Sequence, residues 1–68
     1  MTLSVQCERE ADGRWIADVV DLPGALAYGA TADEATARAK SLALRVVGER
    51  LEHGETDTQL AEITFVQG

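Results

Sequence analysis

The N-terminal part of the chain alternates strictly between apolar and polar residues, which predicts a half-buried β-strand. The apolar positions are Leu3, Val5 and Cys7. An Asp-Gly pair follows at residues 12–13, and this pair favours the tight turn of a β-hairpin. We therefore expect a second strand, over residues 14–20, to run antiparallel to the first.

The expected second strand is mostly apolar on both of its faces, whereas a strand with one solvated face would alternate more cleanly. The two faces carry Trp15, Ala17 and Val19, and Ile16, Asp18 and Val20, respectively. We expect Trp15 to lie in the core beneath a helix, because the small Ala17 lets a helix approach; an interface anchor is the alternative. On the opposite face, two branched apolar residues around one carboxylate form a candidate contact patch, or simply a partly exposed sheet face.

The only proline of the chain marks the end of the second strand. It lies in Leu22-Pro23-Gly24, and proline favours a turn because it fixes its φ angle and lacks an N–H group. A short third strand is expected over residues 25–28. Short links between the three strands predict an antiparallel meander.

A helix is predicted over residues 32–52, because apolar residues recur there at steps of three and four. Thr31 and Glu34 match a capping box, in which the threonine oxygen accepts the N–H of Glu34 and the glutamate accepts the N–H of Thr31. Glu34 and Arg38 have the spacing of a helical ion pair. Gly54 is the expected glycine at the C-terminal cap.

A last strand is expected over residues 60–66, after a polar loop at 55–59. The element order is then β-β-β-α-β. This predicts an α+β fold in a single domain over residues 1–68, with one helix packed on an antiparallel sheet. The last strand can pair with the first strand or reach across to another subunit, and the sequence leaves both possibilities open.

A chain of 68 residues is marginal as a folding unit, because a domain of this size buries only about 60% of the surface that its unfolded chain exposes. Cys7 is the only cysteine and cannot form an internal disulfide, so association is the favoured source of extra burial. We therefore expect a homo-oligomer. Leu44 and Leu51 lie at the edge of the apolar arc of the helix, beyond what one sheet needs to cover, and are candidate contacts.

The acidic composition bears on the class of partner, since the formal net charge is −6. Such a surface repels phosphate backbones, which disfavours direct nucleic-acid binding, and it suits a basic protein partner. The simpler interpretation of the charge is solubility. No apolar run approaches the roughly 20 residues of a membrane span, and the N-terminus lacks the features of a signal peptide. The cytoplasm is therefore the expected location.

The stretch from residue 13 to residue 35 carries short motifs at a definite spacing. These are Gly13-Arg14-Trp15, Val20-Asp21-Leu22-Pro23-Gly24-Ala25, Gly29-Ala30-Thr31 and Glu34-Ala35. Asp-Leu-Pro-Gly followed by Gly-x-Thr-x-x-Glu-Ala, after a strand that carries a tryptophan, resembles the HicB-like antitoxins of bacterial and archaeal toxin–antitoxin pairs. The resemblance covers residues 5–51. The departures from the family pattern are Val20 for proline, Ala25 for cysteine and Ala30 for aspartate.

The resemblance implies a partial ribonuclease H-like domain that binds and occludes a HicA-type toxin. Such a toxin is a small basic ribonuclease that cleaves mRNA by means of a histidine. Many longer members append a DNA-binding module, and we expect none here, because the chain stops at Gly68. The alternative is an orphan domain of the same family that only homo-oligomerises, without a toxin or catalytic activity.

The likeness to ribonuclease H raises the question of whether carboxylates gather around Mg²⁺. The candidates are Asp18, Asp21 and Glu34, and each has a structural interpretation as well, at a strand surface, a turn and a helix cap. Because their spacing does not predict convergence, we expect no catalytic residue, metal site or cofactor, and no enzymatic activity. The predicted site residues are therefore partner contacts: Ile16, Asp18, Val20, Leu44 and Leu51.

Overall fold

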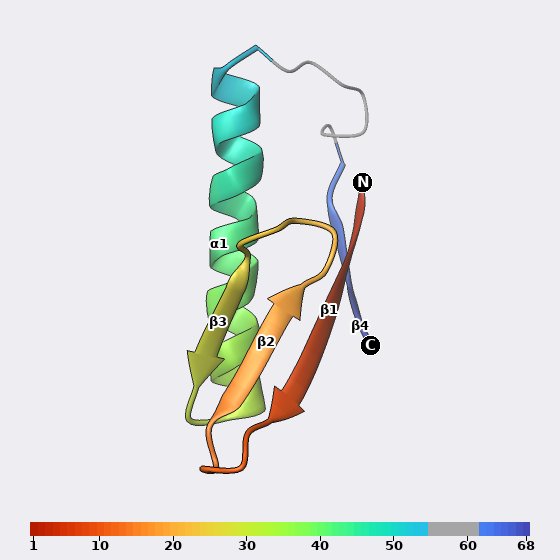
Figure 1. Ribbon diagram of the computed structural model, residues 1–68. Coiled ribbons are helices and arrows are strands. Elements are labelled where there is room, and N and C mark those ends of the chain that lie inside the picture. The colour runs from red at the N-terminus through yellow and green to blue at the C-terminus, as the bar shows by residue number, and fades with distance from the viewer. Residues whose placement is uncertain (55–61) are drawn as a thin grey trace.

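The computed structural model describes residues 1–54 and 62–68. Four strands form one sheet in the order β3-β2-β1-β4, and a single helix packs on one of its faces (Figure 1). The elements are β1 (Thr2–Arg9), β2 (Trp15–Val19), β3 (Leu26–Gly29), α1 (Ala32–Glu52) and β4 (Thr64–Gln67). The predicted α+β fold with the order β-β-β-α-β is confirmed.

The sheet is mixed rather than antiparallel throughout. β1, β2 and β3 form the expected antiparallel meander, while β4 pairs with β1 in the parallel direction. The chain reverses direction at each of the first four elements, so the fifth element runs in the same direction as the first. A last strand that lies beside β1 must therefore be parallel to it. Of the two possibilities that the sequence left open, the chain adopts pairing with its own first strand.

The last strand is shorter than the pattern indicated. It was expected over residues 60–66, and the structure has it at Thr64–Gln67. The expected polar loop at 55–59, together with Leu60 and Ala61, lies outside the described residues. The predicted bounds of the helix are confirmed at both ends.

The core lies between α1 and the sheet and is built largely from small side chains. The fully buried apolar residues are Leu3, Val5, Ala17, Val19, Leu22, Ala25, Ala35, Ala39, Ala43 and Val47. The helix lies mainly over β3 and β2 and less over β1. Trp15 packs against this core and is half-buried, which supports its interpretation as a core residue. No helix among the described residues is long and apolar enough to cross a membrane.

Gly29 allows the end of β3 to approach the start of α1 closely. A Cβ atom at this position would lie 2.5 Å from the main-chain nitrogen of Ala35, closer than any real contact of that kind. Main-chain atoms of a helix cannot move aside as a flexible side chain would. The glycine therefore determines how closely the sheet and the helix pack at this end of the molecule.

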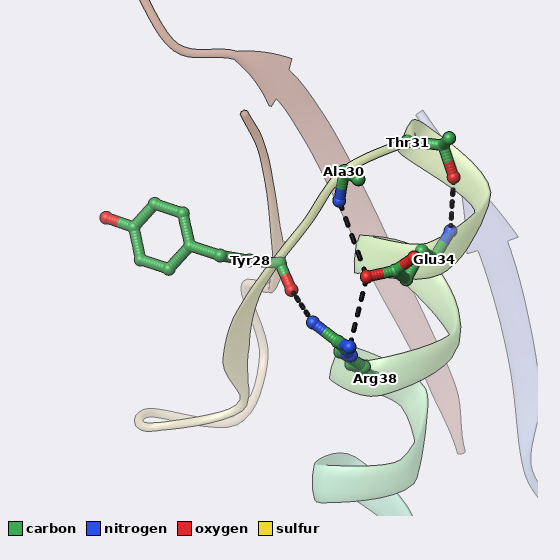
Figure 2. A network of polar contacts seen from close by, with 5 residues as sticks. All are labelled: Tyr28, Ala30, Thr31, Glu34 and Arg38. Carbon is green, nitrogen blue, oxygen red and sulfur yellow. Dashed lines mark hydrogen bonds and ion pairs between the residues drawn. The ribbon is translucent and has the colours of Figure 1, made fainter. Parts of the chain in front are cut away.

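Figure 2 shows the polar contacts that hold the start of α1 against β3. Thr31 Oγ1 accepts the N–H of Glu34 at 3.1 Å, as predicted. Glu34 Oε1 accepts the N–H of Ala30 at 3.4 Å instead of the N–H of Thr31, which corrects the second half of the expected capping box. Glu34 also forms the expected ion pair with Arg38 at 3.0 Å. Arg38 Nη1 in turn donates to the carbonyl oxygen of Tyr28 at 2.9 Å.

Candidate partner-binding face

The face of the sheet that points away from α1 carries both apolar and acidic side chains. We call it the outer face, and it comprises Thr2, Ser4, Gln6, Glu8, Ile16, Asp18, Leu26, Tyr28, Thr64 and Val66. Val20, one residue beyond β2, has the same parity and continues this face. Four of these apolar residues, Val20, Leu26, Tyr28 and Val66, are at least 40% exposed. The outer face thus carries apolar side chains on three of its strands, and no described part of the chain covers them.

An open hollow of about 430 Å³ lies at the centre of this face. Its lining consists of Gln6, Cys7, Glu8, Ile16, Asp18, Leu26 and Gly68. The strand register accounts for the arrangement, since Gln6 lies opposite Asp18, and Asp18 lies opposite Leu26 on the next strand. Glu8, opposite Ile16, is therefore a diagonal neighbour of Asp18 across β1 and β2. Two carboxylates thus border an apolar floor.

The carboxylates of Glu8 and Asp18 have no ion-pair partner within residues 1–54 and 62–68. No basic side chain lines the hollow either. Asp18 is half-buried between apolar neighbours, where an unpaired charge interacts with water less favourably than at an open surface. A cationic group brought by another molecule would find two acceptors here and would meet no competing cation in the lining.

Arg14, which contacts Tyr28 of the outer face, is bound within its own hairpin. Arg14 lies over the ring of Tyr28, 4.7 Å from the centroid, and its Nε is 2.8 Å from Asp12 Oδ2. The Arg14 main-chain N–H also donates to Asp12 Oδ1 at 3.0 Å. This main-chain hydrogen bond, supported by the guanidinium, holds the pKa of Asp12 below its ordinary value of 3.8. The arginine charge is therefore balanced locally at the edge of the face.

The structure brings together some of the predicted contact residues and separates others. Ile16 and Asp18 both line the hollow. Val20 lies beyond it, at the end of the β1–β2 pairing, where its N–H donates to Ser4 O at 3.1 Å. Leu44 and Leu51 are each about half exposed, but they belong to α1, in the other layer of the molecule. The five residues therefore do not form one surface.

Several residues of the face were missed in the sequence. On β3, the large side chains of Leu26 and Tyr28 point outward, while the small Ala25 and Ala27 pack toward the core. Alternation of small and large residues over 25–28 was the available signal for this part of the face. The contribution of Glu8 had no local signal, because it depends on how β1 and β2 are aligned.

The other candidate carboxylates have structural partners. Asp21 Oδ2 accepts the main-chain N–H of Ser4 at 2.6 Å and so extends the pairing of β1 with the end of β2. Glu34 caps α1 and pairs with Arg38. Across the described ranges, no three His, Cys, Asp or Glu side chains lie close enough together to hold a metal ion.

Cys7 is half-buried beneath the start of α1 rather than exposed on the outer face. Its thiol donates to the carbonyl oxygen of Ala32 and accepts from the hydroxyl of Thr36, both at 3.8 Å. These contacts are typical of a cysteine that packs as a small apolar residue. Cys7 therefore only forms part of the wall of the hollow.

Comparison of the chain with protein-family models, curated proteins and solved structures gives no match. What can be inferred about function therefore depends on two features of the chain itself. These are the motifs over residues 13–35 and the geometry of the outer face.

Proposed function

We propose that this chain is a HicB-like antitoxin, which binds a small basic HicA-type toxin and covers the surface with which that toxin binds RNA. The motifs over residues 13–35 suggest the family. The observation that carries the proposal is the hollow of the outer face, where the unpaired carboxylates of Glu8 and Asp18 border an apolar floor.

The chemistry of the hollow suits a lysine or arginine side chain on the surface of a protein. The apolar part of such a side chain can pack on Ile16 and Leu26, and its charged end can reach Asp18 and Glu8. The exposed apolar residues around the hollow would exclude water from these charge pairs and so strengthen them. A toxin whose basic residues are engaged in this way cannot present them to an RNA backbone. In this proposal the chain inhibits by contact and supplies no catalytic residue.

The net charge of −6 supports the same class of partner at longer range. Opposite net charges accelerate the encounter of two proteins, and salt screens this attraction over about 10 Å at 0.1 M ionic strength. The proposed complex should therefore form faster and more tightly at low salt. A partner held only by apolar contacts would show much less dependence on salt.

The test is binding to the protein encoded beside this chain, which the proposal expects to be small and basic. We expect a complex by calorimetry, with weaker binding at about 500 mM than at about 50 mM NaCl, and inhibition of any RNA cleavage by that protein. Asp18→Asn and Glu8→Gln should each weaken binding by at least about tenfold, since each would leave a partner cation without its pair.

Glu52→Gln is the matched control, because it removes the same charge from an exposed position at the far end of α1. It should change the affinity only slightly. Equal effects of Glu52→Gln and Asp18→Asn would contradict a role for the hollow. If no complex with the neighbouring basic protein forms at low salt, the antitoxin proposal is wrong, and a domain that only self-associates becomes the better description.

A further inference from the structure

The two edges of the sheet differ in how their main-chain groups are satisfied. At the β3 edge, Val19 N–H donates to Ala25 O at 2.9 Å. The main-chain N–H and C=O groups of every second residue, starting at Ala25, therefore point toward β2. The main-chain groups of Leu26 and Tyr28 therefore turn away from the sheet. Arg38 donates to the carbonyl oxygen of Tyr28 at 2.9 Å (Figure 2), so a side chain of α1 partly closes this edge.

Among the described residues, none covers the β4 edge in this way. Thr64 N–H donates to Met1 O at 2.9 Å, and Gly68 N–H donates to Val5 O at 2.8 Å. The main-chain groups of the even-numbered residues of β4 therefore point toward β1, and those of Phe65 and Gln67 point away from it. Within the described residues, these groups of Phe65 and Gln67 have no hydrogen-bond partner. They form a row that a further strand can pair with.

β4 also lacks the usual protection of an edge strand. Natural edges carry lysine, proline, a bulge or an inward-pointing charge, which prevents pairing with other chains. The strand reads Thr-Phe-Val-Gln and contains none of these residues. In a chain with a net charge of −6, an uncharged strand is the place where an equally acidic second copy can approach without placing like charges opposite each other.

We propose that the β4 edge is the interface for a second copy of this chain. The two β4 strands would pair antiparallel about a two-fold axis, which doubles the four-stranded sheet and places both helices on the same face. With Phe65 opposite its own symmetry mate, Gln67 lies opposite Ile63 of the other copy. The outward main-chain groups of Phe65 and Gln67 then all gain partners.

This arrangement also accounts for the half-exposed Phe65. In the single chain, the cation of Lys40 lies 5.4 Å from the centre of the Phe65 ring, on the side of the sheet that α1 covers. Pairing at β4 brings two Phe65 rings side by side on that face, a favourable cross-strand contact. Leu44 and Leu51 follow Lys40 at helical spacing, so they face the groove that forms between the two helices.

The paired form leaves the outer face open, so it is compatible with the proposed function and does not depend on it. Two hollows would lie on the same side of the doubled sheet. Failure to bind a toxin would leave the β4 interface unaffected, and a monomeric chain that still binds a toxin would refute only the interface.

The test is the mass of the full chain by sedimentation equilibrium between about 1 and about 500 μM, a range in which a dimer of moderate affinity changes its population. We expect a monomer–dimer equilibrium. Gln67→Pro removes an N–H that makes no contact within the described chain, and proline is tolerated at such an edge position. It should weaken the dimer by at least about tenfold, because the N–H pairs across the interface.

Gln67→Ala is the control, because it keeps the N–H and removes only the side chain; its dimer should resemble that of the parent chain. Hydrogen exchange on the parent chain gives a second measurement that needs no substitution. The amides of Phe65 and Gln67 should become protected as the concentration rises, while the amide of Leu26 should not. A monomer over the whole range, or a dimer in which these two amides stay unprotected, would overturn the proposal.

Discussion

The two faces of the sheet differ in side-chain size around β3. There Ala25 and Ala27 point inward while Leu26 and Tyr28 point outward, although β2 also places the large Trp15 on the inner side. A monomer would ordinarily bury its largest apolar side chains and expose its smallest ones. The small inner side chains of this part of the sheet let α1 pack closely on it, while the larger side chains leave apolar area exposed on the outer face.

The electrostatics of the two regions differ in the same way. Around the start of α1, the polar groups of Thr31, Glu34 and Arg38 all contact groups of their own chain. On the outer face, Glu8 and Asp18 have no ion-pair partner among the described residues. The polar groups at the start of α1 are therefore paired within the chain, whereas these two carboxylates of the outer face are not paired within the described residues. Two predictions test this contrast, and a third tests the charge pairing within the first hairpin.

The largest effect is expected from truncating the same residue type on the two faces. Leu3 is 0% exposed and Leu26 is 42% exposed. Leu3→Ala should lower the free energy of unfolding by about 2–5 kcal/mol, because it leaves a cavity in the core. Leu26→Ala should cost less than about 1 kcal/mol, since its side chain is only partly removed from water. Urea unfolding of both variants measures the difference, and equal losses would contradict the contrast.

A smaller effect is expected from adding one methyl group at two glycines. Gly29→Ala would push a Cβ atom into the main chain of Ala35, which should destabilise the fold by about 1–3 kcal/mol. Gly48→Ala meets open space on α1 and should stabilise the helix by about 0.5–1 kcal/mol. Thermal unfolding should therefore shift in opposite directions for the two variants. A neutral Gly29→Ala would mean that α1 is not held closely against β3.

The smallest effect is expected at Asp12, which lies at the surface in the first hairpin. Its pKa is below the ordinary value of 3.8 in the folded chain, first because of the main-chain N–H of Arg14. A lowered pKa in the folded state contributes stability above the unfolded value, and this contribution is lost as the pH falls through the folded value. Asp12→Asn should therefore be slightly less stable than the parent chain at neutral pH.

The difference in stability between the parent chain and Asp12→Asn should disappear in strong acid, where both carry an uncharged group at residue 12. Urea unfolding at several pH values, from neutral to below 3.8, measures it. A gap of constant size at every pH would show that charge on Asp12 does not stabilise the hairpin.

Sequence patterns predicted the parts of the molecule whose contacts are local. The helix bounds follow from apolar spacing, from the cap at Thr31 and from Gly54, which has a φ of +80° just after the helix. The hairpin between β1 and β2 follows from alternation and an Asp-Gly turn. Each of these signals acts over a few residues, so it can be recognised without knowledge of the rest of the chain.

The candidate site was only partly predictable for the opposite reason. Ile16 and Asp18 stood out because they lie on one strand with apolar residues on both sides. Glu8 and Leu26 join them only through the register of three strands. Leu44 and Leu51 were correctly identified as exposed apolar residues, but their position in the other layer depends on which face of α1 meets the sheet.

What the sequence by itself determined is therefore the set of elements and their order, because hydrogen bonds within a helix or a tight hairpin are encoded by neighbours along the chain. Only the tertiary structure decided that β4 lies parallel to β1, with an edge that is unpaired among the described residues, and that acids from β1 and β2 border a common hollow. The first feature depends on pairing between residues about 60 positions apart, such as Thr2 with Thr64, and the second depends on the register in which β1 and β2 are aligned. Such pairing is selected by the packing of the whole domain rather than by any local pattern.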